Sequence, residues 1–127
     1  MRVRLPWPPS ELRPNRGGSW SKKAMARKAY RDRCYLETLI VKPGLEAVPE
    51  GPLSLTMRFC PPSRYKVPDA DNLVASMKGG IDGMCDALGF DDGRFVESHE
   101  YVLEPEREGY VLVDVGRGVK PMTPLID

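Results

Sequence analysis

The chain has 127 residues, which is enough to bury one modest hydrophobic core, so we expect a single domain. Its apolar content of 41% is ordinary, and no apolar run is long enough for a membrane span or a secretory signal, which predicts a soluble, cytoplasmic protein without a membrane partner. The net charge of +1 hides an uneven distribution, because residues 1–33 carry ten Lys and Arg side chains against two acids. This asymmetry predicts one basic and one acidic surface, although a solvated helix face accounts for residues 22–33 equally well.

The first half of the chain predicts a strand, a loop, a helix and a second strand. Alternating apolar residues indicate a strand over residues 1–5, and a loop rich in proline and glycine follows. A helix is expected from Ser19 or Ser21, each a plausible N-cap, to about Val41, with Ala26, Tyr30, Cys34 and Val41 near one face. Residues 53–60 alternate again and predict a half-buried strand that two prolines end.

The second half predicts a helix and two further strands. Beyond Asp71, apolar residues spaced by three and four indicate a helix buried along one stripe: Leu73, Met77, Ile81, Met84 and Leu88. Residues 95–103 and 110–115 flank a turn at residues 105–109 and predict an antiparallel hairpin. The expected fold is therefore an α/β (α+β) two-layer sandwich of order β-α-β-α-β-β, with a mixed sheet that ends in the hairpin. We expect the domain to span residues 1–115 and residues 116–127 to form a loose tail.

Acidic side chains gather on either side of the second predicted helix. We expect Asp69 to end the extended segment after Pro68 and Asp71 to lie at or near the helix N-cap, with both carboxylates pointing the same way, while Asp91 and Asp92 follow the end of the helix. Capping of the helix explains the first pair and a polar turn explains the second when each is taken alone. Together, in a chain with one histidine and a basic end, the four acids favour a magnesium site that acts on a nucleic-acid phosphodiester.

The helix between these acids is an obstacle to this interpretation. If it were straight, its roughly 17 residues would hold the two pairs about 25 Å apart. Three glycines, at 79, 80 and 83, indicate either a break in the helix or a second backbone, such as that of a symmetry mate, in close approach. A third possibility is that the following strand runs back toward the first pair of acids. Lys78 lies on the same helical face as Asp82, where it either serves the acidic site or forms a surface ion pair.

Three segments together resemble the RusA family of Holliday junction resolvases: "LPWPPSELRPNR", "DADNLVASMKGGIDGMCDAL" and "GFDDGRF". The resemblance covers residues 3 to about 97. It implies a homodimer that binds four-way DNA junctions and cuts two symmetry-related strands with Mg²⁺, for which Mn²⁺ could substitute. The resemblance implies that no organic cofactor is needed.

Carried over residue by residue, the resemblance implies a metal held by Asp69, Asp71 and Asp92, with Asp91 as the alternative third ligand. Many family members have a lysine four residues after the second aspartate, where this chain has Ala75; Lys78 is the nearest lysine and the expected catalytic cation. DNA backbone contacts are expected from polar and basic side chains near the motifs: Arg13, Asn15, Arg16, Lys22, Lys23, Arg64, Lys66 and Arg94.

Two other functions fit the same residues. One is a nuclease of the same chemistry that acts on flaps, forks or duplex DNA, because nothing in the sequence reads branch geometry. The other is a non-catalytic module that binds branched DNA or is stabilised by a metal.

The three cysteines, Cys34, Cys60 and Cys85, are far apart and lack a CxxC spacing, which predicts reduced, buried thiols. His99 is the only histidine. This inventory argues against a zinc site, so a bound metal is expected among oxygen ligands.

Overall fold

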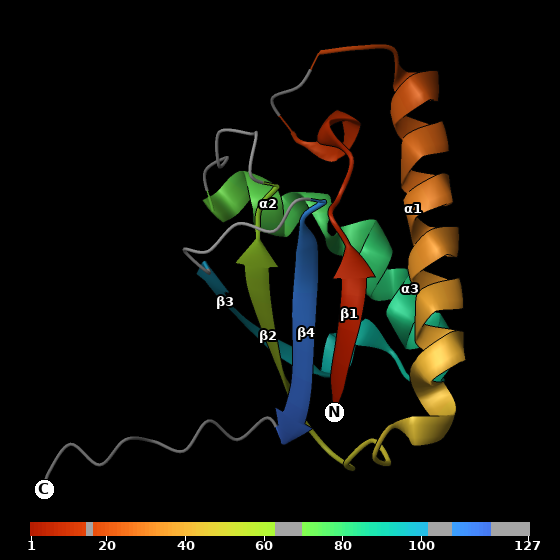
Figure 1. The fold of residues 1–127 in the computed structure, drawn as a ribbon, viewed down its shortest axis with the longest axis vertical. Coiled ribbons are helices and arrows are strands. Elements are labelled where there is room, and N and C mark those ends of the chain that lie inside the picture. Colours follow the sequence, from red (N-terminus) through yellow and green to blue (C-terminus); the bar gives the residue numbers. More distant parts are fainter. Residues whose placement is uncertain (15–16, 63–69, 102–107, 118–127) are drawn as a thin grey trace, which may run out of the picture.

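A four-stranded mixed sheet and the helices that pack on it make up two layers in the computed structural model, which describes residues 1–14, 17–62, 70–101 and 108–117 (Figure 1). The strands are β1 (Arg2–Pro6), β2 (Leu53–Cys60), β3 (Phe95–Tyr101) and β4 (Tyr110–Arg117). The helices are α1 (Trp20–Val41), α2 (Ala70–Ser76) and α3 (Lys78–Leu88), with short 3₁₀ turns η1 (Ser10–Leu12), η2 (Lys42–Gly44) and η3 (Asp92–Arg94). The predicted two-layer α/β class is confirmed. Within the described residues, no helix has the length and hydrophobicity needed to cross a membrane.

The strands are ordered β1-β4-β2-β3 in the sheet. β4 pairs antiparallel with both β1 and β2, whereas β2 and β3 pair in parallel. Alternate residues of β2 and β4 are buried, as the period of two in the sequence predicted. Their side chains form the core with those of the helices.

The predicted C-terminal hairpin is wrong in its pairing. β3 and β4 do run antiparallel, but both edges of β4 are occupied by β1 and β2, so β2 lies between the two strands. β4 also continues to Arg117, two residues beyond the predicted end of the domain. Residues 118–127, the rest of the predicted tail, lie outside the described residues.

α1 begins at the predicted Ser19 N-cap, whose hydroxyl accepts a hydrogen bond from the Lys22 backbone N–H at 3.2 Å. Its buried stripe is Tyr30, Cys34 and Thr38. Thr38 belongs to this stripe instead of Val41 because its hydroxyl donates to the Cys34 carbonyl at 2.8 Å, which satisfies a buried polar group.

The second predicted helix is interrupted at Met77, which lies between α2 and α3. The glycines of α3 also allow a close approach by a second backbone, and this backbone is α1 of the same chain. A Cβ atom on Gly80 would lie 2.5 Å from the Tyr30 ring, and one on Gly83 would overlap the carbonyl oxygen of Arg31. Two of the three alternatives raised by these glycines therefore occur together, and a symmetry mate is not needed to explain them.

Candidate functional site

The chain reverses direction directly after α3. Gly89 adopts a left-handed conformation with φ of 81°, and the N–H groups of Gly89 and Phe90 both donate to the Cys85 carbonyl. This turn folds Asp91 and Asp92 back against the last turns of α3. The result is an open pocket of about 340 Å³, here called the acidic pocket, lined by Arg31, Lys78, Asp82, Cys85, Asp86, Phe90, Asp91 and Asp92.

Asp82 and Asp92 form the closest acidic pair of this pocket. Partial burial raises the pKa of Asp82, and a hydrogen bond to Asp92 and the negative charge of Asp92 raise it further, while Arg31 and Lys78 act in the opposite direction. Two carboxyl groups at such short range favour either a shared proton or a cation between them. The pair therefore has the chemistry that a divalent cation requires.

The other pocket residues limit the chemistry of the site. Burial raises the pKa of the Cys85 thiol to about 12, and the surrounding carboxylates add to the shift, so the sulfur stays protonated at neutral pH. Arg31 donates to Asp86 from α1 across to α3, with its Nη2 atom 2.7 Å from Oδ2. Cys85 is therefore a poor nucleophile at neutral pH, and the charged groups carry the chemistry.

The structure brings Lys78, Asp91 and Asp92 together but leaves Asp71 elsewhere. Asp71 lies in the first turn of α2, which follows the end of β2, whereas η3 precedes a β3 strand whose first residue pairs with the first residue of β2. Asp71 and Asp92 thus lie at opposite ends of the α2–α3 pair. Asp69 is outside the described residues, and within the described ranges no three Asp, Glu, His or Cys side chains are close enough to hold one metal.

Asp82 is the acidic partner that sequence reasoning missed. In the sequence Asp82 is only a helical neighbour of Lys78, because its position in the middle of a helix gives no motif. The available signal was Gly89, since a glycine after the last apolar residue of a helix predicts a left-handed cap. Such a cap turns the following residues back toward the last helical turns.

A second feature, the basic groove, runs along the N-terminal half of α1. It has a volume of about 380 Å³ and is lined by Trp20, Lys23, Ala24, Arg27, Lys28 and Arg31. Trp20 is 84% exposed. Arg31 lines both the basic groove and the acidic pocket, so the two features are continuous. Of the expected DNA contacts, Lys23 lies in this groove, whereas Lys22 is exposed on α1 and does not line it.

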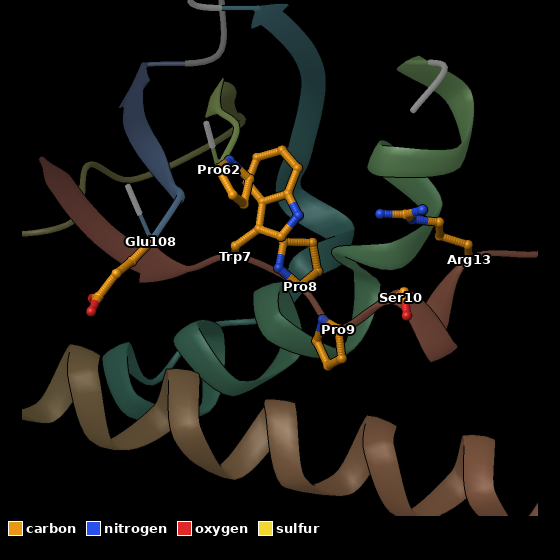
Figure 2. Close-up of a pocket in the computed structure, with 7 residues that line it drawn as sticks. All are labelled: Trp7, Pro8, Pro9, Ser10, Arg13, Pro62 and Glu108. Carbon is orange, nitrogen blue, oxygen red and sulfur yellow. The ribbon is translucent and has the colours of Figure 1, made fainter. Parts of the chain in front are cut away.

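Arg13 lies in a different pocket, of about 440 Å³, formed by the N-terminal loop (Figure 2). The other residues that line this pocket are Trp7, Pro8, Pro9, Ser10, Pro62 and Glu108. Trp7 packs edge-on against Phe59 with ring centroids 6.1 Å apart, which anchors the loop, and η1 contacts α2. Arg13 and Asp71 therefore lie at the same end of the fold, away from the acidic pocket.

Arg94 has a structural role in the described residues. Its guanidinium donates to the backbone carbonyls of Pro49 and Gly51 and lies 5.6 Å from the centroid of the Phe90 ring. These contacts hold the segment before β2 against the turn after α3. The remaining expected DNA contacts lie outside the described residues: Asn15, Arg16, Arg64 and Lys66.

The three cysteines are free and buried, as the sequence predicted. Burial also raises the pKa of Cys34 to about 12. Free thiols buried in the core contribute to its packing.

Comparison with known proteins gives one informative relative. No family model matches the chain. A protein of Xylella fastidiosa strain Temecula1, described as an uncharacterized protein, is 39% identical over 115 residues, which cover 87% of this chain and 72% of that protein.

Proposed function

We propose that this chain, which belongs to the same family as the Xylella fastidiosa protein, is a metal-dependent endodeoxyribonuclease that cuts branched DNA such as four-way junctions as a homodimer. The observation that carries this proposal is the continuity of the basic groove with the acidic pocket through Arg31. A groove of cations leads directly to a cluster of carboxylates, as hydrolysis of a phosphodiester requires.

The basic groove is the feature that favours a polyanionic substrate. Its lysines and arginines contribute positive charge along one path, and each phosphate that they contact releases a counterion. Trp20 offers an exposed ring on which an unpaired base at a branch point can stack. These contacts would position the DNA without reading its sequence.

The acidic pocket is the feature that favours a divalent cation as the cofactor. In the described residues Asp82 and Asp92 would hold it, with Asp91 beside them, and a bound Mg²⁺ or Mn²⁺ would supply Lewis-acid activation of a water molecule. The Lys78 ammonium lies at the same pocket and would offset negative charge on the departing oxygen. The expected products are ends with 5′-phosphate and 3′-hydroxyl groups.

Asp92 is common to this pair and to the set that the RusA resemblance implies. Asp71, another member of that set, lies at the other end of the α2–α3 pair and would have to join Asp92 through a rearrangement or from a second protomer. We therefore propose Asp92 as the essential ligand and treat Asp71 and Asp82 as competing second ligands. Their asparagine variants distinguish the two ligand sets.

The test is cleavage of a labelled synthetic four-way junction with Mg²⁺, beside flap, fork and matched duplex substrates. Asp92→Asn should reduce the rate at least about 100-fold while junction binding, measured by gel shift in EDTA, is retained. Glu46→Gln, which alters an exposed acid outside both the acidic pocket and the basic groove, is the control and should cut normally. Wild-type cleavage by Asp92→Asn would refute the assignment.

A non-catalytic branched-DNA-binding module is the second candidate. It is favoured by the basic groove, whose cations and exposed Trp20 would bind DNA whether or not a metal is held. Junction binding without nicking across a Mg²⁺ and Mn²⁺ titration would establish it. For either function we propose a cytoplasmic location, because the three free cysteines fit a reducing compartment.

A further inference from the structure

Arg31 lines both the basic groove and the acidic pocket, and one edge of its guanidinium is already bound. The Nε and Nη2 atoms, which lie along that edge, both donate to Oδ2 of Asp86, at 3.1 Å and 2.7 Å. The Nη1 end forms no hydrogen bond within the described part of the chain. Because the Arg31 side chain is 47% exposed, a ligand in the groove can reach these free N–H groups.

The backbone of Arg31 is held in place by packing, independently of its ion pair. α1 and α3 lie side by side, and the Arg31 carbonyl oxygen rests where a Cβ atom on Gly83 would overlap it (Figure 1). An ion pair between half-exposed side chains contributes little stability, so the contact between the two helices does not depend on the Arg31–Asp86 pair. What the pair does fix is the direction of the guanidinium.

This direction places the guanidinium beside the Asp82–Asp92 carboxylate pair. Asp82 and Asp86 are one turn apart on α3, about 6 Å along the helix axis. The charge of Arg31 reaches Asp82, because it opposes the burial that raises the pKa of that carboxyl group. An anion that enters the acidic pocket from the basic groove therefore passes the free end of Arg31 before it reaches the carboxylates.

We propose that Arg31 is a catalytic residue that binds the reacting phosphate through its free Nη1 end, and that Asp86 is the positioning residue that orients it. This inference rests on the proposed function. A guanidinium suits the task because it is planar and presents donors on two edges, so that it can bind a carboxylate and a phosphate at the same time. The compact ammonium group of a lysine does not present two such edges.

The contribution of Arg31 would be largest in the transition state. As the bond from the attacking water to phosphorus forms and the bond to the departing 3′ oxygen breaks, negative charge on the phosphoryl oxygens is stabilised by a donor that is already in place. Arg31 stays protonated throughout and transfers no proton.

The Arg31–Asp86 pair carries no net charge, which separates its role from that of the other cations in the groove. A neutral pair adds little to the release of counterions from DNA, and thus little to affinity. Lys23 and Arg27 form no ion pair among the residues that the structure describes, so they would supply the affinity. Loss of Arg31 should therefore lower kcat, whereas loss of Arg27 should mainly raise KM.

Steady-state cleavage of the synthetic four-way junction with Mg²⁺ tests this separation. Arg31→Lys should lower kcat about 100-fold with KM nearly unchanged, and Asp86→Asn should lower kcat about 10-fold because the guanidinium loses its orientation. Arg33→Gln is the matched control, since it breaks the Arg33–Glu37 ion pair of the same helix outside both the basic groove and the acidic pocket. This control should cut at the wild-type rate, and circular dichroism should show that all three variants are folded.

NMR of the arginine side chains tests the contact without relying on cleavage. In protein labelled with nitrogen-15, the Nε–H signal of Arg31, assigned through its loss in Arg31→Lys, should shift when the junction is added in EDTA. The signal of Arg33 should stay in place. An Arg31 signal that the junction leaves unchanged would overturn the proposal.

The two measurements also separate this inference from the proposed function. Cleavage by Arg31→Lys with the wild-type kcat would overturn the role of Arg31 and leave the nuclease intact. A shifted Arg31 signal in a wild-type chain that cuts no DNA would refute the nuclease and leave Arg31 as a phosphate contact.

Discussion

Gly83 is the position where the contact between α1 and α3 leaves least room, so Gly83→Ala should destabilise the fold. A Cβ atom there would overlap the Arg31 carbonyl oxygen and lie 3.1 Å from the carbonyl carbon and 3.2 Å from the Tyr35 nitrogen. All three atoms belong to the backbone of α1, which cannot yield by changing a rotamer. The two helices must separate to admit the methyl group.

The expected magnitude combines two opposing contributions. Overpacking a rigid contact costs about 3 kcal/mol, while replacing glycine by alanine in a helix contributes about 1 kcal/mol of stability. The net loss of about 2 kcal/mol corresponds to a melting temperature lower by about 8 °C for a domain of this size. Gly79→Ala is the matched control, because its Cβ would meet the flexible Arg27 side chain at 3.1 Å and the Arg27 carbonyl oxygen at 3.5 Å, an ordinary van der Waals distance.

Thermal unfolding followed by circular dichroism measures both variants. We expect Gly83→Ala to melt about 8 °C below the wild type and Gly79→Ala to melt at the wild-type temperature or up to about 4 °C above it. If Gly83→Ala were as stable as the wild type, the close approach of α1 to α3 would be wrong. Movement of Arg31 away from Asp86 should also weaken DNA cleavage in this variant.

Two further variants test the acidic pocket and the core. Asp82→Asn should stabilise the fold by a few tenths of a kcal/mol at pH 8 and by less at pH 4. The pKa of Asp82 is raised in the folded state, so its charged form beside Asp92 destabilises the fold as the pH rises through this pKa. Urea unfolding of the variant and the wild type at both pH values measures the difference in stability, and a larger gain at pH 4 than at pH 8 would contradict the prediction. Tyr30→Phe removes the hydroxyl that donates to the Pro6 carbonyl at 2.6 Å and should cost about 1–2 kcal/mol in urea unfolding, whereas an unchanged midpoint would show that this bond adds no stability.

Local patterns predicted the elements of this fold but not all of their neighbours. The alternation in residues 53–60 identified β2, and Ser19 identified the start of α1, because each signal lies within a few residues of its consequence. The partner of β4 depends instead on β1, more than one hundred residues earlier in the chain. A turn-like segment between β3 and β4 therefore suggested a hairpin that the sheet does not form.

The candidate site was predictable only in part for the same reason. Lys78, Asp91 and Asp92 were expected and do lie at one pocket, because they flank a single helix and its cap. The proximity of Asp82 to Asp92 depends on how far the chain turns at Gly89, and the residue types alone do not predict this angle. The position of Asp71 depends on the interruption of the helix at Met77. The three glycines indicated that the helix is interrupted, but they did not show at which residue.

The place of β4 in the sheet bears on how a nascent chain acquires this structure. β1 is made before the other strands, but its partner among the described strands is β4, and the Met1 ammonium donates to the Val115 carbonyl at 3.0 Å. During translation the first strand must therefore wait, without its sheet partner, until nearly the whole domain has left the ribosome. A chain that ends before residue 110 would lack β4 and would leave β1 and one edge of β2 unpaired. Such a fragment should be a substrate for chaperones and proteases.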